Sequence, residues 1–338
     1  MIKVVLSFLA GGATVAAVYF AQLFLSELPP SELASVESTQ AQESFMERLG
    51  PHLIDLATGD IATRRQILDE HFYQPKIDEA RKLYPVKEHA VDIAGVYTEI
   101  FEPIDGIPPE NSNRVLINLH GGGFSVGART EGQLESIPVA SVAGMRVISV
   151  DYRQGPEHKF PAASEDVAKV YVELLERYEP AQIGIFGCSA GGLLTAEVIA
   201  WFDAHDIPQP GAIGIFCSGA GDFMVGDAAL ISDTLGTSFG NEPMEYFEGA
   251  SWSDPLVAPL GHPQLLAKFP PSLIITSTRD LALSSAIATH QQLIGVGARS
   301  ELHVFEGMMH YFFSDTGLPE SRQAFDVIAR FFDTRLAH

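Results

Sequence analysis

The sequence predicts an α/β protein whose central sheet is mostly parallel and carries helices on both faces. Short apolar runs alternate along the chain with longer amphipathic stretches, a pattern typical of βαβ units. The short runs are predominantly apolar, as expected for strands that are covered on both sides. With 338 residues, of which 46% are hydrophobic and 19% charged, the chain can bury a large core.

The predicted elements follow one another from about residue 43. Residues 43–88 are mixed in polarity and predict helices, and Val91–Glu102 contains short β-like runs. The later apolar runs predict strands at Val115–Leu119, Val147–Val150, Ile183–Phe186, Ala212–Cys217, Leu273–Ser277 and Leu302–Phe305. Stretches with apolar residues at helical spacing predict helices at Glu131–Ala143, Ala163–Arg177, Gly191–Phe202, Leu283–Ile294 and Pro319–Arg335.

One long stretch, Gly221–Pro263, fits neither pattern, although it contains several apolar and aromatic residues. A long insertion with its own apolar surface is often a lid over a site. We therefore expect a cap insertion at about residues 221–263. A peripheral pair of helices without a role in substrate binding is the alternative.

The N-terminal run Val4–Leu25 is uncharged, follows Lys3 and is long enough for a membrane span of ~20 residues. It predicts a signal-anchor, with Lys3 inside and the rest of the chain exported. A cleaved signal peptide, with small residues for cleavage at Val15 and Ala17, is one alternative. The other is an apolar helix that packs on the domain. The first two place the protein in the periplasm, at the membrane or outside the cell, and the third places it in the cytoplasm.

The composition excludes some classes of partner and of site. The formal net charge of −22 disfavours nucleic acid and anionic membrane surfaces, because both repel an acidic protein. Solubility or a saline habitat explains this charge better than the choice of a partner. The two cysteines, Cys188 and Cys217, match neither a disulfide framework nor a metal-binding spacing. We expect free thiols rather than a bridge, and no metal or other cofactor.

Catalytic chemistry is first indicated by Gly187–Gly191 (GCSAG), which directly follows the apolar run Ile183–Phe186. In this G-x-S-x-G pattern a sharp turn between a strand and a helix presents the hydroxyl of Ser189 at the edge of the sheet, and flanking glycines avoid steric clashes. The helix that begins there adds N–H groups that favour an oxyanion. Because an ordinary glycine turn has the same composition, the predicted strand and helix around the pattern decide for the catalytic interpretation.

A serine hydroxyl is a poor nucleophile until a histidine removes its proton, and the imidazole needs a carboxylate to orient it. Asp280 follows the strand Leu273–Ser277, and His310 follows the strand Leu302–Phe305. Both lie at carboxyl ends of strands, where open α/β sheets place their sites. We therefore predict a catalytic triad of Ser189, Asp280 and His310.

Other acids and histidines fit these roles less well. Asp254 precedes the strand Leu273–Ser277 instead of following it. His303 lies within a predicted strand, His290 lies on a predicted helix, and His338 ends the chain. None of them occupies the end of a strand, as His310 does.

The second glycine-rich segment, His120–Phe124 (HGGGF), directly follows the strand Val115–Leu119. Three consecutive glycines let a backbone approach a substrate closely and direct its N–H groups inward. Together with the N–H group of Ala190 they can form an oxyanion hole. A phosphate-binding loop is the alternative, but neither G-x-x-x-x-G-K-[ST] nor G-x-G-x-x-G is present here.

In combination these motifs resemble one family, the hormone-sensitive-lipase-like esterases, which are the bacterial family IV of the α/β-hydrolases. The resemblance covers about residues 43–336. It rests on segments that occur in the family's order: His120–Phe124, the block Asp151–Ala163, the elbow 187–192, Asp280 and the segment around His310. The resemblance implies an α/β-hydrolase fold with a helical cap and ester hydrolysis without a cofactor. It also implies the triad named above and oxyanion donors at Gly122, Gly123 and Ala190.

The chain departs from the family's pattern at three places. Cys188 stands where the elbow usually has Asp or Glu, which affects the support of the turn or the choice of acyl group. Gln154-Gly155 replaces the usual Leu-Ala, and Leu281-Ala282-Leu283 replaces the usual Pro-Leu-Arg after the acid. The last departure weakens the assignment of Asp280.

The resemblance divides the chain into an apolar N-terminal segment with a linker (1–42), an N-terminal part of the cap (43–90) and a catalytic domain (91–338). We expect small-molecule esters with short to medium acyl chains as substrates. Membrane anchoring through residues 4–25 and a homodimer are further expectations. The functional alternatives are an amidase or arylformamidase with the same triad and a ligand-binding receptor of the same fold. Such receptors lack the catalytic histidine, which His310 supplies here.

Overall fold

The computed structural model describes residues 31–235 and 244–337, without the side chains of residues 42–47 and 233–235. These residues form one eight-stranded sheet in the order β1-β2-β4-β3-β5-β6-β7-β8. The strands are β1 (Val86–Ile93), β2 (Val96–Pro103), β3 (Val115–Leu119), β4 (Arg146–Val150), β5 (Ile183–Cys188), β6 (Ala212–Phe216), β7 (Ser272–Arg279) and β8 (Ser300–Met309). β2 pairs antiparallel with β1 and with β4, and all remaining pairs are parallel. The predicted α/β fold with a mostly parallel sheet is therefore confirmed.

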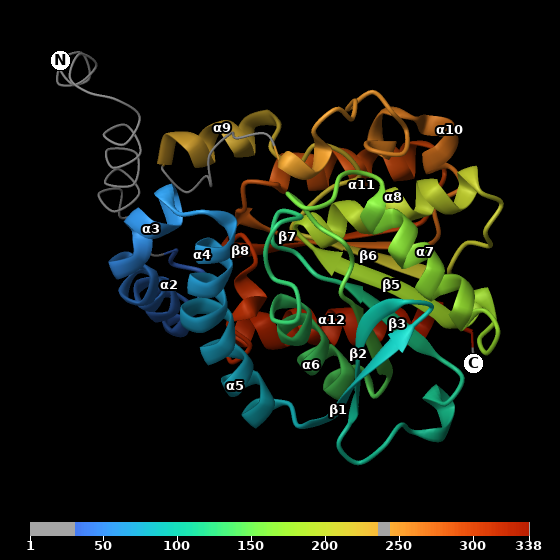
Figure 1. Cartoon of the computed structure of the whole chain (residues 1–338), viewed down its shortest axis with the longest axis horizontal. Helices are drawn as coiled ribbons and strands as arrows, with labels where there is room; N and C mark the ends of the chain where they lie inside the picture. Colours follow the sequence, from blue (N-terminus) through green and yellow to red (C-terminus); the bar gives the residue numbers. More distant parts are fainter. Residues whose placement is uncertain (1–30, 236–243, 338) are drawn as a thin grey trace.

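Helices cover both faces of this sheet. α7 (Ala162–Leu174), α8 (Ala190–Ala204) and α11 (Leu283–Gly295) bury their apolar side chains in one core cluster. α6 (Glu131–Ala143) and α12 (Pro319–Arg335) contribute to a second cluster on the other face. Figure 1 shows the first group above the sheet and the second below it. Because both faces are covered, the inner strands β3, β5 and β6 are buried at every position.

The sequence predicted most of these elements to within a few residues, and the helices α6 and α12 at their observed bounds. The predicted ends of β7 and β8 fell short, because both strands continue through polar or glycine-containing segments to Arg279 and Met309. The prediction of helix up to residue 88 was wrong at its end, since β1 begins at Val86. β1 is an exposed edge strand with charged residues, so it lacks the alternation that indicates a half-buried strand.

The N-terminal helices pack beside β8 and α12, at the blue end of the chain in Figure 1. They are α2 (Val36–Leu49), α3 (Leu53–Thr58), α4 (Ile61–Leu68) and α5 (Gln74–Leu83). A π-helical turn, η4 (Asp69–Tyr73), joins α4 to α5. Asp60 caps α4, because its Oδ1 accepts the N–H of Thr63 at 2.9 Å.

The region of the expected cap insertion contains α9 (Gly226–Leu235), the short 3₁₀ turns η7 (Glu245–Phe247) and η8 (Pro259–Gly261), and α10 (Pro263–Leu266). In Figure 1, α9 and α10 lie on the same side of the sheet as α11. The predicted signal-anchor at Val4–Leu25 and the terminal His338 lie outside the described residues. Of the described helices, none combines the length and the apolar composition needed to cross a membrane.

Candidate active site

The G-x-S-x-G segment forms a tight turn between β5 and α8. Ser189 lies between these elements with φ 55° and ψ −120°, a backbone conformation that costs a non-glycine residue about 1–3 kcal/mol. Its N–H donates to the Phe216 carbonyl of β6 at 2.8 Å, which helps to hold the turn. A Cβ atom at Gly187 or Gly191 would lie 2.2 or 1.8 Å from the Leu119 carbonyl oxygen at the end of β3. Both positions therefore require glycine, because the end of β3 lies against the turn.

Ser189, His310 and Asp280 are joined by hydrogen bonds although they lie far apart in the sequence. The distance from His310 Nε2 to Ser189 Oγ is 3.0 Å, and the distance from His310 Nδ1 to Asp280 Oδ1 is 2.7 Å. Asp280 is the residue directly after β7, and His310 is the residue directly after β8. Because β5, β6, β7 and β8 are parallel neighbours, all three residues lie at the carboxyl ends of the strands, on the same side of the molecule.

Asp280 is buried and surrounded by donors. Thr276 Oγ1 donates to Oδ2 at 2.9 Å, and the N–H of Ala282 donates to Oδ1 at 2.9 Å. Burial by itself raises the pKa of Asp280, but the attraction of His310 and the hydrogen bonds outweigh it, so the pKa is lowered. The carboxyl is therefore ionised at neutral pH. Ala282 supports Asp280 through its backbone, so this contact does not depend on the side chains by which the segment 281–283 departs from the family.

The pKa of His310 is subject to the same two effects, burial and the neighbouring opposite charge, but each acts in the opposite direction. Burial by itself lowers the pKa of His310, but the adjacent Asp280 carboxylate outweighs this effect and raises the pKa. Only 11% of the His310 side chain is exposed, and Asp280 is fully covered. The ring is therefore a base whose protonated form the buried carboxylate stabilises.

A second turn lies next to the serine and consists of residues His120–Gly127, which we call the glycine loop. Gly122 and Gly123 have φ angles of 84° and 59°. The carbonyl of Gly122 accepts the N–H groups of Ser125 and Val126 at 3.0 Å each, which closes the turn. Among the described residues, no group accepts a hydrogen bond from the N–H groups of Gly122, Gly123 or Ala190. These three donors are therefore available to a ligand.

The block Asp151–Ala163 contacts the glycine loop through Tyr152 and Gly155. The ring of Tyr152 stacks on His120 with 4.3 Å between the centroids, and its hydroxyl donates to the His120 carbonyl at 2.7 Å. The N–H of Gly155 donates to the Phe124 carbonyl at 2.7 Å. His120 is buried, and burial lowers its pKa, so its imidazole serves as a neutral packing group.

The expected cap insertion also reaches the glycine loop. Tyr246 and Phe247 of η7 are buried, and the Tyr246 ring stacks on Phe124 with 4.7 Å between the centroids. Phe247 contacts the same ring edge-on at 5.0 Å. Tyr246 and Phe247 of the insertion therefore belong to the core that packs against the glycine loop.

The sequence interpretation missed two buried carboxyl groups beside this loop. Glu131 and Glu135 lie one helical turn apart in the first half of α6 and are only 2% and 3% exposed. The Tyr73 hydroxyl donates to Glu131 Oε2 at 2.7 Å, and Asn118 Nδ2 donates to Glu135 Oε2 at 2.7 Å. The spacing of two glutamates by four residues, shortly after the glycine loop, was the available signal. It is also typical of an exposed helix face, so burial could not be predicted from it.

The rival acid and histidines lie elsewhere. Asp254 caps a turn, because its Oδ1 accepts the N–H of Leu256 at 2.9 Å. His290 on α11 contacts Ser300 through its Nδ1 at 2.9 Å, and His303 lies within β8. In the described part of the chain, none of the three joins the hydrogen bonds around Ser189.

Both cysteines are buried and free, as expected. Cys217 Sγ accepts the N–H of Tyr311 at 3.4 Å and lies with its possible ligand partners, Asp280 and His310, in a group whose ligand atoms are within 4.8 Å of one another. Both ring nitrogens of His310 are already engaged by Asp280 and Ser189. The arrangement is thus that of a proton-transfer chain, with Cys217 packed against it.

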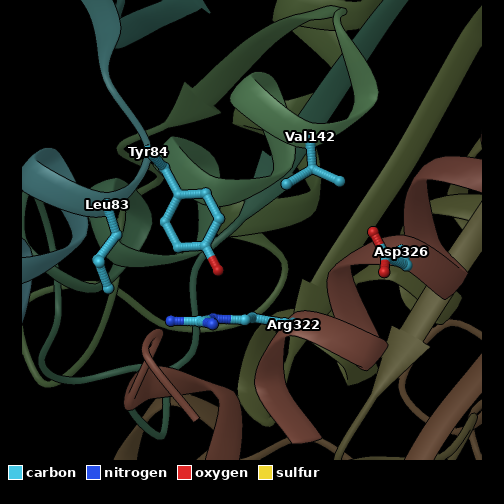
Figure 2. A pocket seen from close by; sticks show the side chains of 5 residues that line it. All are labelled: Leu83, Tyr84, Val142, Arg322 and Asp326. Atoms are coloured by element: carbon cyan, nitrogen blue, oxygen red, sulfur yellow. The ribbon is translucent and has the colours of Figure 1, made fainter. Parts of the chain in front are cut away.

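A shallow cavity of about 300 Å³ lies between the end of α5, α6 and α12, and shares no residue with the site around Ser189. Figure 2 shows the side chains that line it: Leu83, Tyr84, Val142, Arg322 and Asp326. Arg322 lies beside the Tyr84 hydroxyl and lowers its pKa, against a larger increase from burial.

The profile of a protein family described as having the alpha/beta hydrolase fold matches residues 116–314. The acetyl-hydrolase of Streptomyces hygroscopicus is 30% identical over 237 residues, which are 67% of this chain and 78% of that protein. The crystal structure of esterase E25 superposes with a TM-score of 0.79 at 29% identity and covers 92% of this chain and 97% of its own. An esterase of the bacterial hormone-sensitive lipase family superposes with a TM-score of 0.76 at 25% identity, over 90% of this chain and 99% of its own.

Proposed function

The chain belongs to the α/β-hydrolase family and is a carboxylesterase, and we propose that it cleaves short- to medium-chain acyl esters through a triad of Ser189, His310 and Asp280. The observation that carries this proposal is the continuous pair of hydrogen bonds from Ser189 Oγ through His310 to Asp280. The similarity to an acetyl-hydrolase and to esterases supports an ester as the substrate.

The first half of the reaction forms an acyl-enzyme. His310 Nε2 takes the proton of the Ser189 hydroxyl as its oxygen attacks the ester carbonyl carbon. The negative charge that develops on the carbonyl oxygen is stabilised by the N–H groups of Gly122, Gly123 and Ala190. Asp280 stabilises the imidazolium without accepting its proton. His310 then protonates the leaving alcohol, and the C–O bond breaks.

The second half releases the acid and restores the serine. Water takes the place of the alcohol, and His310 removes a proton from it as the water oxygen attacks the acyl carbon. The second tetrahedral intermediate collapses when His310 returns that proton to Ser189 Oγ, and the carboxylic acid leaves. The low pKa of Asp280 supports this role, because an ionised carboxylate is needed in both halves.

The proposal is tested with p-nitrophenyl esters from acetate to palmitate, hydrolysed by the wild type and by Ser189→Ala side by side. We expect activity on the short and medium acyl chains and its loss in the variant, by at least ~10³-fold in kcat. Circular dichroism checks that the variant is folded. A folded wild type without activity on any ester would contradict the function, and a fully active Ser189→Ala would contradict the nucleophile.

A matched pair of an ester and an anilide with the same acyl group tests the amidase alternative. The proposal expects the ester to have the higher kcat/KM. Membrane anchoring through residues 4–25 and a homodimer stay predictions, because the first concerns residues outside the described ranges and the second concerns a partner chain.

A further inference from the structure

We propose that the N-terminal helices position the oxyanion hole. Tyr73 of these helices holds the carboxyl group of Glu131 on α6, and this carboxyl group packs against both ends of the glycine loop. Neither residue is expected to touch the substrate, so both are positioning residues. This inference rests on the proposed function, because the glycine loop supplies two of the three proposed oxyanion donors. It assigns a role in the reaction to helices that contribute no residue to the triad.

The carboxyl group of Glu131 occupies the space inside the glycine loop. A Cβ atom at Gly121 would lie 2.2 Å from Glu131 Oε1, and one at Gly127 would lie 2.7 Å from Glu131 Oε2. Both ends of the loop therefore pass against the same carboxyl group, which is only 2% exposed. Because protein interiors are closely packed, a shift of this carboxyl group moves the loop that lies on it.

Tyr73 holds that carboxyl group in place. Its hydroxyl donates to Glu131 Oε2 at 2.7 Å, and the side chain is buried. Tyr73 is the last residue of the π-helical turn η4, and π turns within helices occur frequently at functional sites. The first residue of the same turn, Asp69, accepts the Thr130 hydroxyl at 2.7 Å. The turn thus contacts two consecutive residues, Thr130 and Glu131, shortly after the glycine loop.

Arg65, on α4, makes a third contact, and this one is with the loop itself. Its Nε donates to the Ser125 carbonyl of the glycine loop at 2.7 Å, and its Nη2 donates to the Gly155 carbonyl at 2.9 Å. Glu157 holds the same guanidinium with hydrogen bonds of 2.6 and 2.9 Å. Residues 65–73 of the N-terminal helices therefore contact the glycine loop directly through Arg65 and indirectly through Tyr73 and Glu131.

The charge of Glu131 also reaches the proposed catalytic base. Burial raises the pKa of Glu131 to about 7, while the Tyr73 hydroxyl and the charge of His310 act in the opposite direction. In return, Glu131 contributes to the raised pKa of His310, after the larger effects of burial and Asp280. The other titratable groups around Glu131 are Tyr73, Glu135, Tyr152, Cys188 and Tyr311. None of these is a cation, so His310 is the positive charge that Glu131 stabilises.

The test compares Tyr73→Phe and Glu131→Gln with the wild type in steady-state ester hydrolysis across pH. Tyr171→Phe is the matched control, because Tyr171 is also a buried tyrosine and its hydroxyl has no hydrogen-bond partner within the described residues. We expect both test variants to lose about 10- to 100-fold in kcat with little change in KM, because the oxyanion donors are misplaced in the transition state. The control is expected to keep the kcat of the wild type.

The pH profile adds a readout of the charge of Glu131 that a general loss of structure would not move. Protonated His310 cannot act as a base, so kcat/KM falls as the pH drops through the pKa of His310. Removing the charge of Glu131 lowers that pKa, so in Glu131→Gln the acid limb moves to lower pH. Tyr73→Phe makes Glu131 easier to protonate and moves the limb in the same direction.

The outcomes are distinguishable from a failure of the proposed function. If the wild type hydrolyses esters, Ser189→Ala is inactive and Tyr73→Phe retains the kcat and the acid limb of the wild type, the positioning role is refuted and the esterase assignment stands. A folded Glu131→Gln that keeps the kcat of the wild type, or that loses activity through KM instead of kcat, would also overturn it, because the oxyanion donors would then not depend on the carboxyl group.

Discussion

At the scale of single residues, the proposed chemistry depends on how Asp280 and His310 affect each other's charge. The pKa of Asp280 is lowered and the pKa of His310 is raised, although burial acts against both shifts. Each residue therefore stabilises the charged form of the other. This is the arrangement that general-base catalysis by a buried histidine requires.

Replacement of the proposed acid is expected to impair catalysis strongly. In Asp280→Asn the orienting carboxylate is lost, and kcat should fall about 10⁴-fold while the protein stays folded. The remaining activity should extend to lower pH, because His310 loses the group that raises its pKa. The measurement is kcat/KM for a short p-nitrophenyl ester from pH 5 to 9, a range of about four units around neutrality.

Asp254→Asn serves as the control for this experiment, because Asp254 is the rival acid and caps a turn before β7. It should keep the activity of the wild type. If Asp254→Asn were inactive and Asp280→Asn were active, Asp254 and not Asp280 would be the carboxylate of the triad.

At the scale of elements, the ends of parallel strands determine where the functional groups lie. Ser189, Asp280 and His310 each follow a strand directly, and the glycine loop follows β3. The motifs could be recognised from the sequence because each is continuous and comes after an apolar run. The bounds were less predictable, since β7 and β8 extend past their apolar parts by pairing with each other, which is a non-local effect.

Two glycines of the same loop are expected to differ in their tolerance of a side chain. A Cβ atom at Gly122 would lie 2.2 Å from the Val126 carbonyl oxygen, whereas at Gly123 the nearest atom outside the neighbours is 3.9 Å away. Gly122→Ala must therefore deform the turn and should cost ~10²–10³ in kcat. Gly123→Ala bears only the strain of its positive φ and should cost clearly less. Steady-state kinetics of both variants checks this order, and equal losses would argue against it.

At the scale of the whole molecule, a large core tolerates polar groups that cost stability. Glu197 on α8 is fully buried, and neither of its carboxyl oxygens has a hydrogen-bond partner among the described residues. Burial raises its pKa well above the usual value of 4.5. The carboxyl group therefore favours the protonated form in the folded state. It destabilises the folded state at any pH at which the same group is ionised in the unfolded chain.

Replacing this carboxyl is expected to stabilise the protein in a defined pH range. The destabilisation is absent below the unfolded-state pKa of about 4.5 and grows as the pH rises toward the folded-state pKa. Glu197→Met should therefore gain about 1–2 kcal/mol of unfolding free energy at neutral pH, and less at pH 4. Urea unfolding at both pH values measures the difference. Glu173→Gln, at an exposed position of α7, is the control and should change little. A gain that does not depend on pH would contradict the mechanism.

The sequence by itself determined the order of strands and helices, the turns that follow them and the candidate residues of the site. These features depend on local patterns, because an apolar run followed by glycine, serine or histidine carries its information within a few residues. Only the tertiary structure decided that Glu131 and Glu135 are buried, that Tyr73 reaches Glu131, and that β1 is an exposed edge strand. The physical reason is that burial and strand pairing depend on segments distant in the chain, such as residues 73 and 131, whose meeting no local pattern records.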